Sequence, residues 1–132
     1  MPTIERINPD TLPDAASLGY AQIVTAEGGK MVFISGQVAW TVDGASPPSD
    51  LAAQSEIAVD NLKKALAAVA ADVSNVVSLR IYVVDYSPDK GEAVLPAILG
   101  AFGSHPTATT VIGVASLADP TLLLEIEAIA VV

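Results

Sequence analysis

The feature that most constrains the fold of this chain is a change of hydrophobic period in its middle. From residue 50 to about residue 71, apolar side chains recur at helical spacing and charged side chains occupy the other positions. Residues 76–86 then alternate with a period of two, as a strand with two different faces does. A second apolar helical stripe ends at Gly103. This succession of helix, strand and helix predicts helices packed against a sheet.

Short strands are predicted before and after this central unit. They are Thr3–Ile7, Tyr20–Ala26, Met31–Ser35, Thr109–Ala115 and Leu122–Val132. Gly28 and Gly29 predict a hairpin turn between the second and the third of these strands. Asp119 and Pro120 predict a turn that joins the last two strands as an antiparallel hairpin. We therefore expect an α+β chain in the order βββαβαββ, with a mixed sheet and both helices on one face.

The ends of the two helices carry their own signals. Asp50, or the serine before it, can accept a backbone N–H of the first helix, and Asp60 can pair with Lys64 one turn along. Pro96 lies inside the second stripe, and proline is unfavourable in a helix interior because it lacks an N–H and its ring clashes. We therefore expect the second helix to begin near Glu92, which would place Pro96 in or near its first turn.

The composition excludes several kinds of chemistry. A length of 132 residues suits a single domain over residues 1–132. The chain has no cysteine and one histidine, so a disulfide or a thiolate site is excluded, and we expect neither a metal nor a cofactor. The 15 acidic residues against 6 basic ones give a net charge of −9, which disfavours a nucleic acid as a partner.

The apolar content is high for a chain of this size. Hydrophobic residues make up 52% and charged residues 16%, but no apolar run approaches the roughly 20 residues of a membrane span. Because no secretory signal is visible at the N-terminus, we expect a cytoplasmic protein without a membrane partner. Val84, Ile129 and Val131 fall on the sheet face that we expect the helices to leave uncovered. Association with further copies of the chain would cover this face.

Four segments carry a resemblance to a known family. They are Gly19–Gln22, Val32–Gln37, the helical residues Gln54 and Asn61, and Leu124–Val131. In this order they make the chain resemble the RidA (YjgF) family over nearly its whole length. The resemblance implies a chorismate-mutase-like fold and a homotrimer with three small-molecule pockets at the subunit interfaces. In the best-studied branch, these pockets hydrolyse imines and enamines derived from amino acids to keto acids and ammonia, whereas other branches lack that activity.

The chain departs from the active branch at the residue that binds the substrate. In that branch an arginine of the penultimate strand grips the substrate carboxylate with two hydrogen bonds. Alignment on residues 114–117 places Thr109 at the arginine and Val111 at a frequent cysteine. A neutral hydroxyl cannot replace a charged contact of two hydrogen bonds. An asparagine of the active branch also falls near Leu95 or Pro96, so we expect little activity on imines that bear a carboxylate.

The resemblance and the strand patterns together name the candidate site residues. Glu125 is the candidate catalytic carboxylate, because it can orient a water or accept a proton. The candidate substrate-binding residues are Tyr20, Ser35, Gly36, Thr109 and Val111. Arg80 is a further candidate that either supplies the missing positive charge or pairs with an acid such as Glu127. His105 is another, since histidine titrates near neutral pH, although a lone histidine in a loop is more often exposed and without a role.

Two functions of different classes remain open. The first is hydrolytic deamination of carboxylate-free imines or enamines, with Glu125 acting on the water. The second is a metabolite-binding trimer that uses the same interface pocket without chemistry. A ribonuclease or translation inhibitor, a label that some relatives carry, is the weakest alternative because the chain has no basic track. A cation that reaches the pocket would bring carboxylate substrates back into contention.

Overall fold

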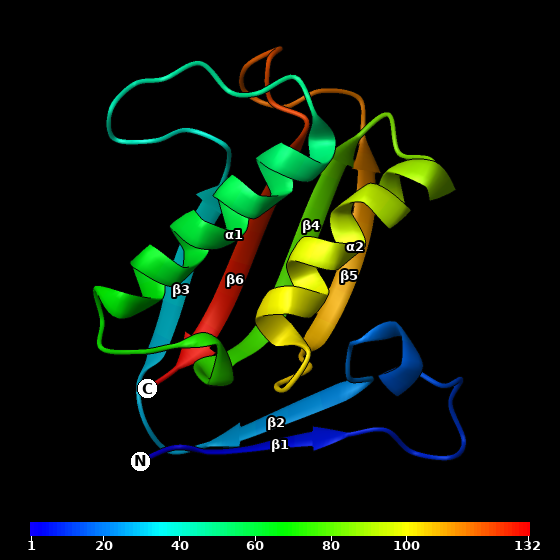
Figure 1. The fold of residues 1–132 in the computed structure, drawn as a ribbon. Helices are drawn as coiled ribbons and strands as arrows, with labels where there is room; N and C mark the ends of the chain where they lie inside the picture. Colours follow the sequence, from blue (N-terminus) through cyan, green and yellow to red (C-terminus); the bar gives the residue numbers. More distant parts are fainter.

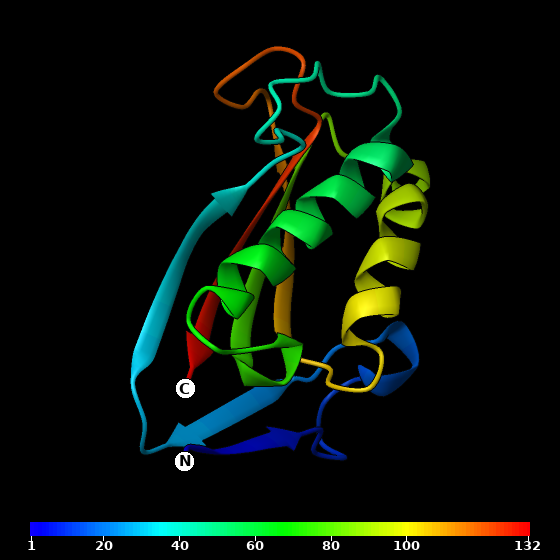
Figure 2. The ribbon, with the colours of Figure 1, turned by 60° about the vertical axis from the view of Figure 1, so that its left-hand side comes forward.

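The computed structural model describes all 132 residues and contains two sheets and two helices. Both helices, α1 (Leu51–Ala67) and α2 (Pro88–Phe102), lie on one face of the larger sheet (Figure 1). The turned view in Figure 2 shows that the opposite face of this sheet has no cover. Neither helix is long and apolar enough to cross a membrane. The larger sheet has the strand order β3 (Met31–Gln37), β6 (Leu124–Val131), β4 (Val76–Val84) and β5 (Ala108–Val114).

The predicted order of elements is confirmed. The chain runs βββαβαββ, and the larger sheet is mixed, because β4 and β5 are parallel whereas β6 is antiparallel to both β3 and β4. Helix α2 makes the crossover between the parallel strands β4 and β5, which is the connection that a parallel pair requires. The first two strands, β1 (Thr3–Ile7) and β2 (Ile23–Glu27), form a separate antiparallel pair.

Both predicted hairpins are wrong, since neither turn joins strands that pair with each other. Strand β6 lies between β3 and β4 rather than beside β5, and β2 pairs with β1 rather than with β3. The central position suits β6, because Leu124, Ile126 and Ala128 along one face of it are all buried. At the other turn, Gly28 and Gly29 adopt positive φ angles of 76° and 75° and lead the chain from the small sheet into β3.

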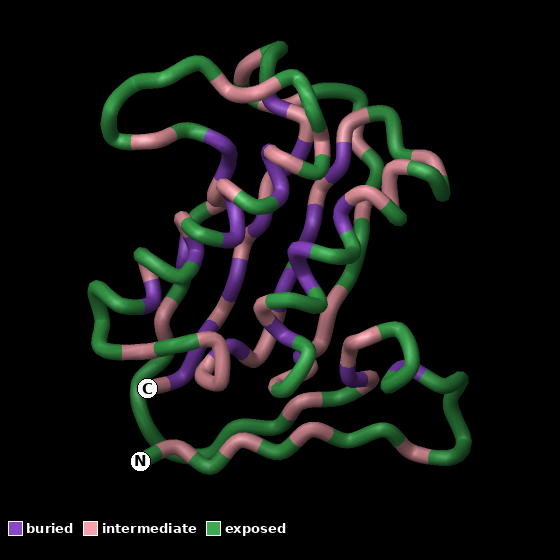
Figure 3. Tube along the Cα trace, viewed as in Figure 1, coloured by how far each residue is buried: buried purple, intermediate pink, exposed green.

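The core fills the space between the larger sheet and the two helices. Figure 3 shows buried chain running along β4, β6 and the inner sides of both helices, while β1, β2 and β5 are mostly exposed or half-buried. The predicted alternation in β4 holds for Leu79, Ile81 and Val83, which are buried, and for Arg80, which is exposed. The register between β4 and β6 shifts at the start of β4, and Val76 is buried there.

The predicted start of α1 and its predicted ion pair are confirmed, whereas α1 ends at Ala67 instead of near residue 71, and the predicted start of α2 is wrong. Asp50 caps α1 by accepting the N–H of Ala53 at 2.9 Å, and the Asp60 carboxylate lies 3.0 Å from the Lys64 ammonium. Helix α2 begins at Pro88 instead of near Glu92, so Pro96 lies in its interior. Pro88 occupies the first turn, where a proline is favourable, and Pro96 is exposed, so water can reach the carbonyl that its missing N–H leaves unpaired.

A buried amide joins the first helix to the segment that enters β6. The side chain of Gln54 is fully buried, and its Nε2 donates to the carbonyl oxygens of Pro48 at 2.7 Å and Thr121 at 2.8 Å. Its Oε1 accepts the N–H of Leu123 at 3.0 Å. Three backbone groups that no sheet or helix satisfies therefore depend on this one side chain.

We expect Gln54→Leu to lower the free energy of unfolding by about 2–4 kcal/mol, because it leaves buried backbone groups without partners. Urea unfolding followed by circular dichroism, at equal protein concentrations, measures this change. Gln37→Leu is the matched control, since the Gln37 amide makes one exposed hydrogen bond to Ser35, and its effect should stay within about 0.5 kcal/mol. Equal effects of the two substitutions would contradict the role of Gln54.

Candidate functional site

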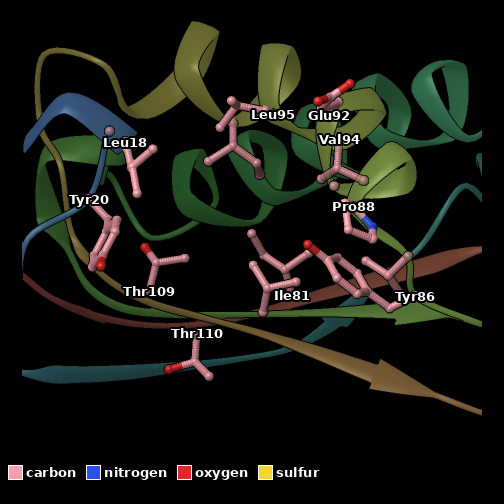
Figure 4. A pocket seen from close by; sticks show the side chains of 15 residues that line it. Leu18, Tyr20, Ile81, Tyr86, Pro88, Glu92, Val94, Leu95, Thr109 and Thr110 are labelled. Carbon is pink, nitrogen blue, oxygen red and sulfur yellow. The ribbon is translucent and has the colours of Figure 1, made fainter. Parts of the chain in front are cut away.

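A pocket of about 560 Å³ lies between α2 and the edge strand β5. Figure 4 shows its lining, which comes from α2, from β4 and β5, and from the segment before β2. The edge of β5 holds that segment in place: Ala21 forms a parallel bridge with Ala108, and the Ala21 N–H donates to the Thr107 carbonyl at 3.0 Å. Tyr20 is therefore placed beside the start of β5.

Three of the predicted substrate-binding residues line this pocket. They are Tyr20, Thr109 and Val111. In the parallel register, Thr109 lies opposite Leu79 and Val111 opposite Ile81, whose side chains face the helices. Thr109 and Val111 therefore point to the helix side of the sheet, and Figure 4 shows Thr109 directed toward the pocket.

The other predicted residues lie on the uncovered face of the sheet. Glu125 alternates along β6 with the buried residues Leu124 and Ile126, so its carboxylate points away from the helices. It lies against Gly36, where an added Cβ would overlap the Glu125 Cδ. Ser35, beside Gly36, is exposed and lines a separate hollow of about 310 Å³ on this face. In a single chain, the pocket and the Glu125 carboxylate are thus on opposite faces.

The two glutamates of β6 have different surroundings. The Tyr82 hydroxyl donates to Glu127 Oε1 at 2.6 Å, and the Arg80 guanidinium lies 3.7 Å from the same oxygen. The hydrogen bond to Glu127 is the main cause that holds the pKa of Tyr82 above its usual value, because the neutral hydroxyl is the donor. Glu125 makes no hydrogen bond and no ion pair within the chain. Of the two carboxylates, Glu125 is the one free to act on a ligand.

The two basic candidates lie outside the pocket. Arg80 is on the uncovered face and pairs with Glu127, so it brings no charge to Thr109 of the same chain. His105 follows α2 and is half-buried, and it does not line the pocket. The pKa of Asp72 is lowered chiefly by hydrogen bonds from Ser74, and the charge of His105 is the last of the causes.

Several pocket residues were not predicted from the sequence. Leu18 and Tyr86 line the pocket, and so does Glu92 at the start of α2. Leu95, one of the two positions near which the asparagine of the active branch falls, also lines it. Tyr86 had one usable signal: it follows the carboxyl end of a strand that leads into a helix, where ligands of α/β proteins often bind.

Comparison with known proteins decides the family. Residues 12–132 match the family described as Endoribonuclease L-PSP. The chain belongs to the RidA (YjgF) family. The Rid-family protein YyfB of Yersinia pestis, a protein of unknown function, has a similar crystal structure with a TM-score of 0.91, at 39% identity over 98% of both chains. Rv2704 of Mycobacterium tuberculosis, of the YjgF/YER057c/UK114 family, gives a TM-score of 0.68 at 28% identity over 100% of both chains.

A further relative matches over a shorter stretch. DfrA of Myxococcus xanthus is 39% identical over 82 residues, which is 60% of this chain and 60% of that protein. The RidA-family chain therefore spans less than two thirds of DfrA in this match. The agreement with YyfB over nearly the full length is what supports the same arrangement of sheet and helices in both proteins.

We expect Gly36→Ala to push the Glu125 carboxylate from its place over β3, because the new methyl group would overlap Cδ, Cγ and Oε2. The cost should stay below about 2 kcal/mol, since a flexible side chain can move aside. A crystal structure of the variant shows the displacement, and urea unfolding measures the cost. In a Glu125→Ala background the same substitution should be nearly neutral. An unmoved Glu125 in the variant would show that Gly36 does not place it.

Proposed function

We propose that this RidA-family chain forms a homotrimer whose small-molecule pockets are completed at the subunit interfaces. The observation that carries the proposal is the separation of the two predicted groups within one chain. Thr109 and Val111 line a pocket on the helix side of the sheet, whereas Glu125 and Gly36 lie on the other face. The Glu125 carboxylate can enter the pocket only from a neighbouring copy, and the family resemblance favours that arrangement.

The uncovered sheet face supports association with further copies. Phe33 is 71% exposed and Met31 59% exposed, although both lie on a strand of the larger sheet. Phe33 and Ile129 line the same hollow on this face, next to the polar cluster of Arg80 and Glu127. Burial of such aromatic and aliphatic side chains contributes roughly 1.5–3 kcal/mol each. A second copy of the chain offers the same face and the same side chains.

For the reaction, we propose hydrolysis of the C=N bond of imines that bear no carboxylate, or of enamines after they have tautomerised to such imines. Water adds to the imine carbon, the C–N bond breaks, and the products are ammonia or an amine and an aldehyde or ketone. Glu125 of the neighbouring subunit would orient the water and accept its proton. Substrates without a carboxylate are favoured because no lysine, arginine or histidine lines the pocket and Thr109 Oγ1 already donates to the Thr107 carbonyl at 2.9 Å.

Binding without chemistry is the second candidate, and the mostly apolar pocket lining favours it. The ribonuclease activity in the family's description is the weakest candidate here. The net charge of −9 repels a phosphate backbone, and the 6 basic residues of the chain form no track that could offset it.

We expect light scattering at micromolar concentration to give a mass three times that of the 13.5 kDa subunit. Phe33→Glu should dissociate the trimer, because it places a charge in an apolar contact. Val42→Glu is the matched control, since Val42 is fully exposed in the loop before α1, and this variant should stay trimeric. A mass of one subunit for the unmodified protein would overturn the proposal.

We expect little turnover of 2-aminoacrylate, which bears a carboxylate, and more turnover of carboxylate-free imines of similar size, with ammonia or aldehyde release as the assay. Thr109→Arg should raise turnover of 2-aminoacrylate about thirty- to a hundredfold through a two-point contact with its carboxylate. Thr109→Gln is the matched control, because its amide reaches into the same space and carries no positive charge.

Three results would contradict these expectations. Equal changes of the rates on carboxylate-bearing and carboxylate-free imines in Thr109→Arg would show that this position does not meet the carboxylate. Unchanged turnover in Glu125→Gln would remove Glu125 from the reaction, whereas no turnover of any imine by the unmodified protein would leave binding as the function.

A further inference from the structure

Tyr86 lines the pocket and packs against two glycines, with its ring at Gly91 and its Cβ at Gly113. Tyr86 follows β4, and it lies against Gly91 of α2 and Gly113 of β5. A Cβ at Gly91 would come within 2.6 Å of the Tyr86 hydroxyl oxygen, and a Cβ at Gly113 within 2.9 Å of the Tyr86 Cβ. Any other residue at either position would move the tyrosine. Figure 4 shows the Tyr86 hydroxyl directed inward, toward Ile81.

Gly91 is unfavourable for α2 itself. A glycine in a helix interior costs about 1 kcal/mol relative to alanine. The backbone at Gly91 does not need glycine, because its φ is not positive. The three atoms nearest to a Cβ at Gly91 all belong to Tyr86, whereas a Cβ at Gly100 in the same helix would meet nothing within 4 Å. The space at Gly91 therefore serves the Tyr86 hydroxyl.

This hydroxyl is free to bind a ligand. Tyr86 is 45% exposed, and its hydroxyl makes no hydrogen bond within the chain. The Thr109 hydroxyl is already bonded to the backbone, and Figure 4 shows the Thr110 side chain directed to the other side of β5. The hydroxyls of Tyr20 and Tyr86 are therefore the available neutral side-chain groups of the pocket. The one charged side chain in the lining is that of Glu92, and it is an acid.

We propose that Tyr86 determines the specificity of this pocket for uncharged ligands that have an apolar body and one hydrogen-bonding group. The inference rests on the proposed function in taking this pocket as the ligand site. A fixed phenol hydroxyl donates to a carbonyl, hydroxyl or imine group and orients the ligand, while the aliphatic walls take the apolar body. Glu92 and the absence of a lining cation disfavour carboxylates.

Benzamide and benzoate test the ligand class, because they have the same planar shape and differ in charge. Isothermal titration of the full chain should give benzamide an affinity at least about tenfold higher than that of benzoate. Tyr86→Phe should weaken benzamide about two- to tenfold, as expected for one lost hydrogen bond. Tyr82→Phe removes a hydroxyl from the opposite face and serves as the control, with the mass in solution measured in parallel.

Gly91→Ala tests whether the packing of the Tyr86 ring against Gly91 matters for binding, and alanine is compatible with the helix. It should keep or raise the thermal stability, because alanine favours the helix, and yet weaken benzamide as Tyr86→Phe does. In the Tyr86→Phe background, where the hydroxyl is absent, Gly91→Ala should change the affinity little further. Gly100→Ala should favour the helix equally and leave the affinity unchanged.

The outcomes separate this inference from the proposed function. If benzoate binds as well as benzamide, or if Tyr86→Phe has no effect, the specificity role of Tyr86 is wrong even where imines are hydrolysed. If benzamide binding depends on Tyr86 as expected and no imine is hydrolysed, the ligand class stands and the proposed reaction fails.

Discussion

The structure depends on the burial of one face of β4 and β6 beneath the two helices. Leu79, Ile81, Leu124 and Ile126 supply this face, and each is almost completely buried. Since successive side chains of a strand point to opposite sides, this burial also decides where their neighbours go. The side chains that alternate with these four residues, such as Arg80 on β4, point to the uncovered face. The same alternation that builds the core therefore separates the chemistry of the chain into two faces.

This separation shapes the proposed function. The pocket between α2 and β5 contains aliphatic walls and tyrosine hydroxyls, and the Glu125 carboxylate is out of its reach in the same chain. The proposed site needs a second copy to join its two parts, and association of copies would bury the exposed Phe33. In this proposal, the reaction therefore depends on the association of copies of the chain. Thr109 restricts the proposed ligands further, because it offers no positive charge that could bind a carboxylate.

Neighbouring polar residues differ in function because their contacts differ. Glu127 is occupied by Tyr82 and Arg80, whereas Glu125 lies over a glycine and remains free. A similar contrast holds for the tyrosines, since Tyr82 donates to a carboxylate while the Tyr86 hydroxyl lies against Gly91 and makes no hydrogen bond. In both cases a glycine makes room for a functional group, which links backbone packing directly to recognition.

The sequence by itself determined the order of elements, the inward faces of the helices and strands, and the neutral residue at position 109. These features follow from local periodicity and from identity at a single position. Only the tertiary structure decided that β6 lies between β3 and β4, that β1 pairs with β2, and that Tyr86 enters the pocket. Strand neighbours are chosen by contacts between distant segments, and a turn sequence does not encode which strand a segment will join. The start of α2 at Pro88 is a similar case. The local pattern disfavours Pro96 inside a helix, but its exposure to water makes the missing helical hydrogen bond tolerable.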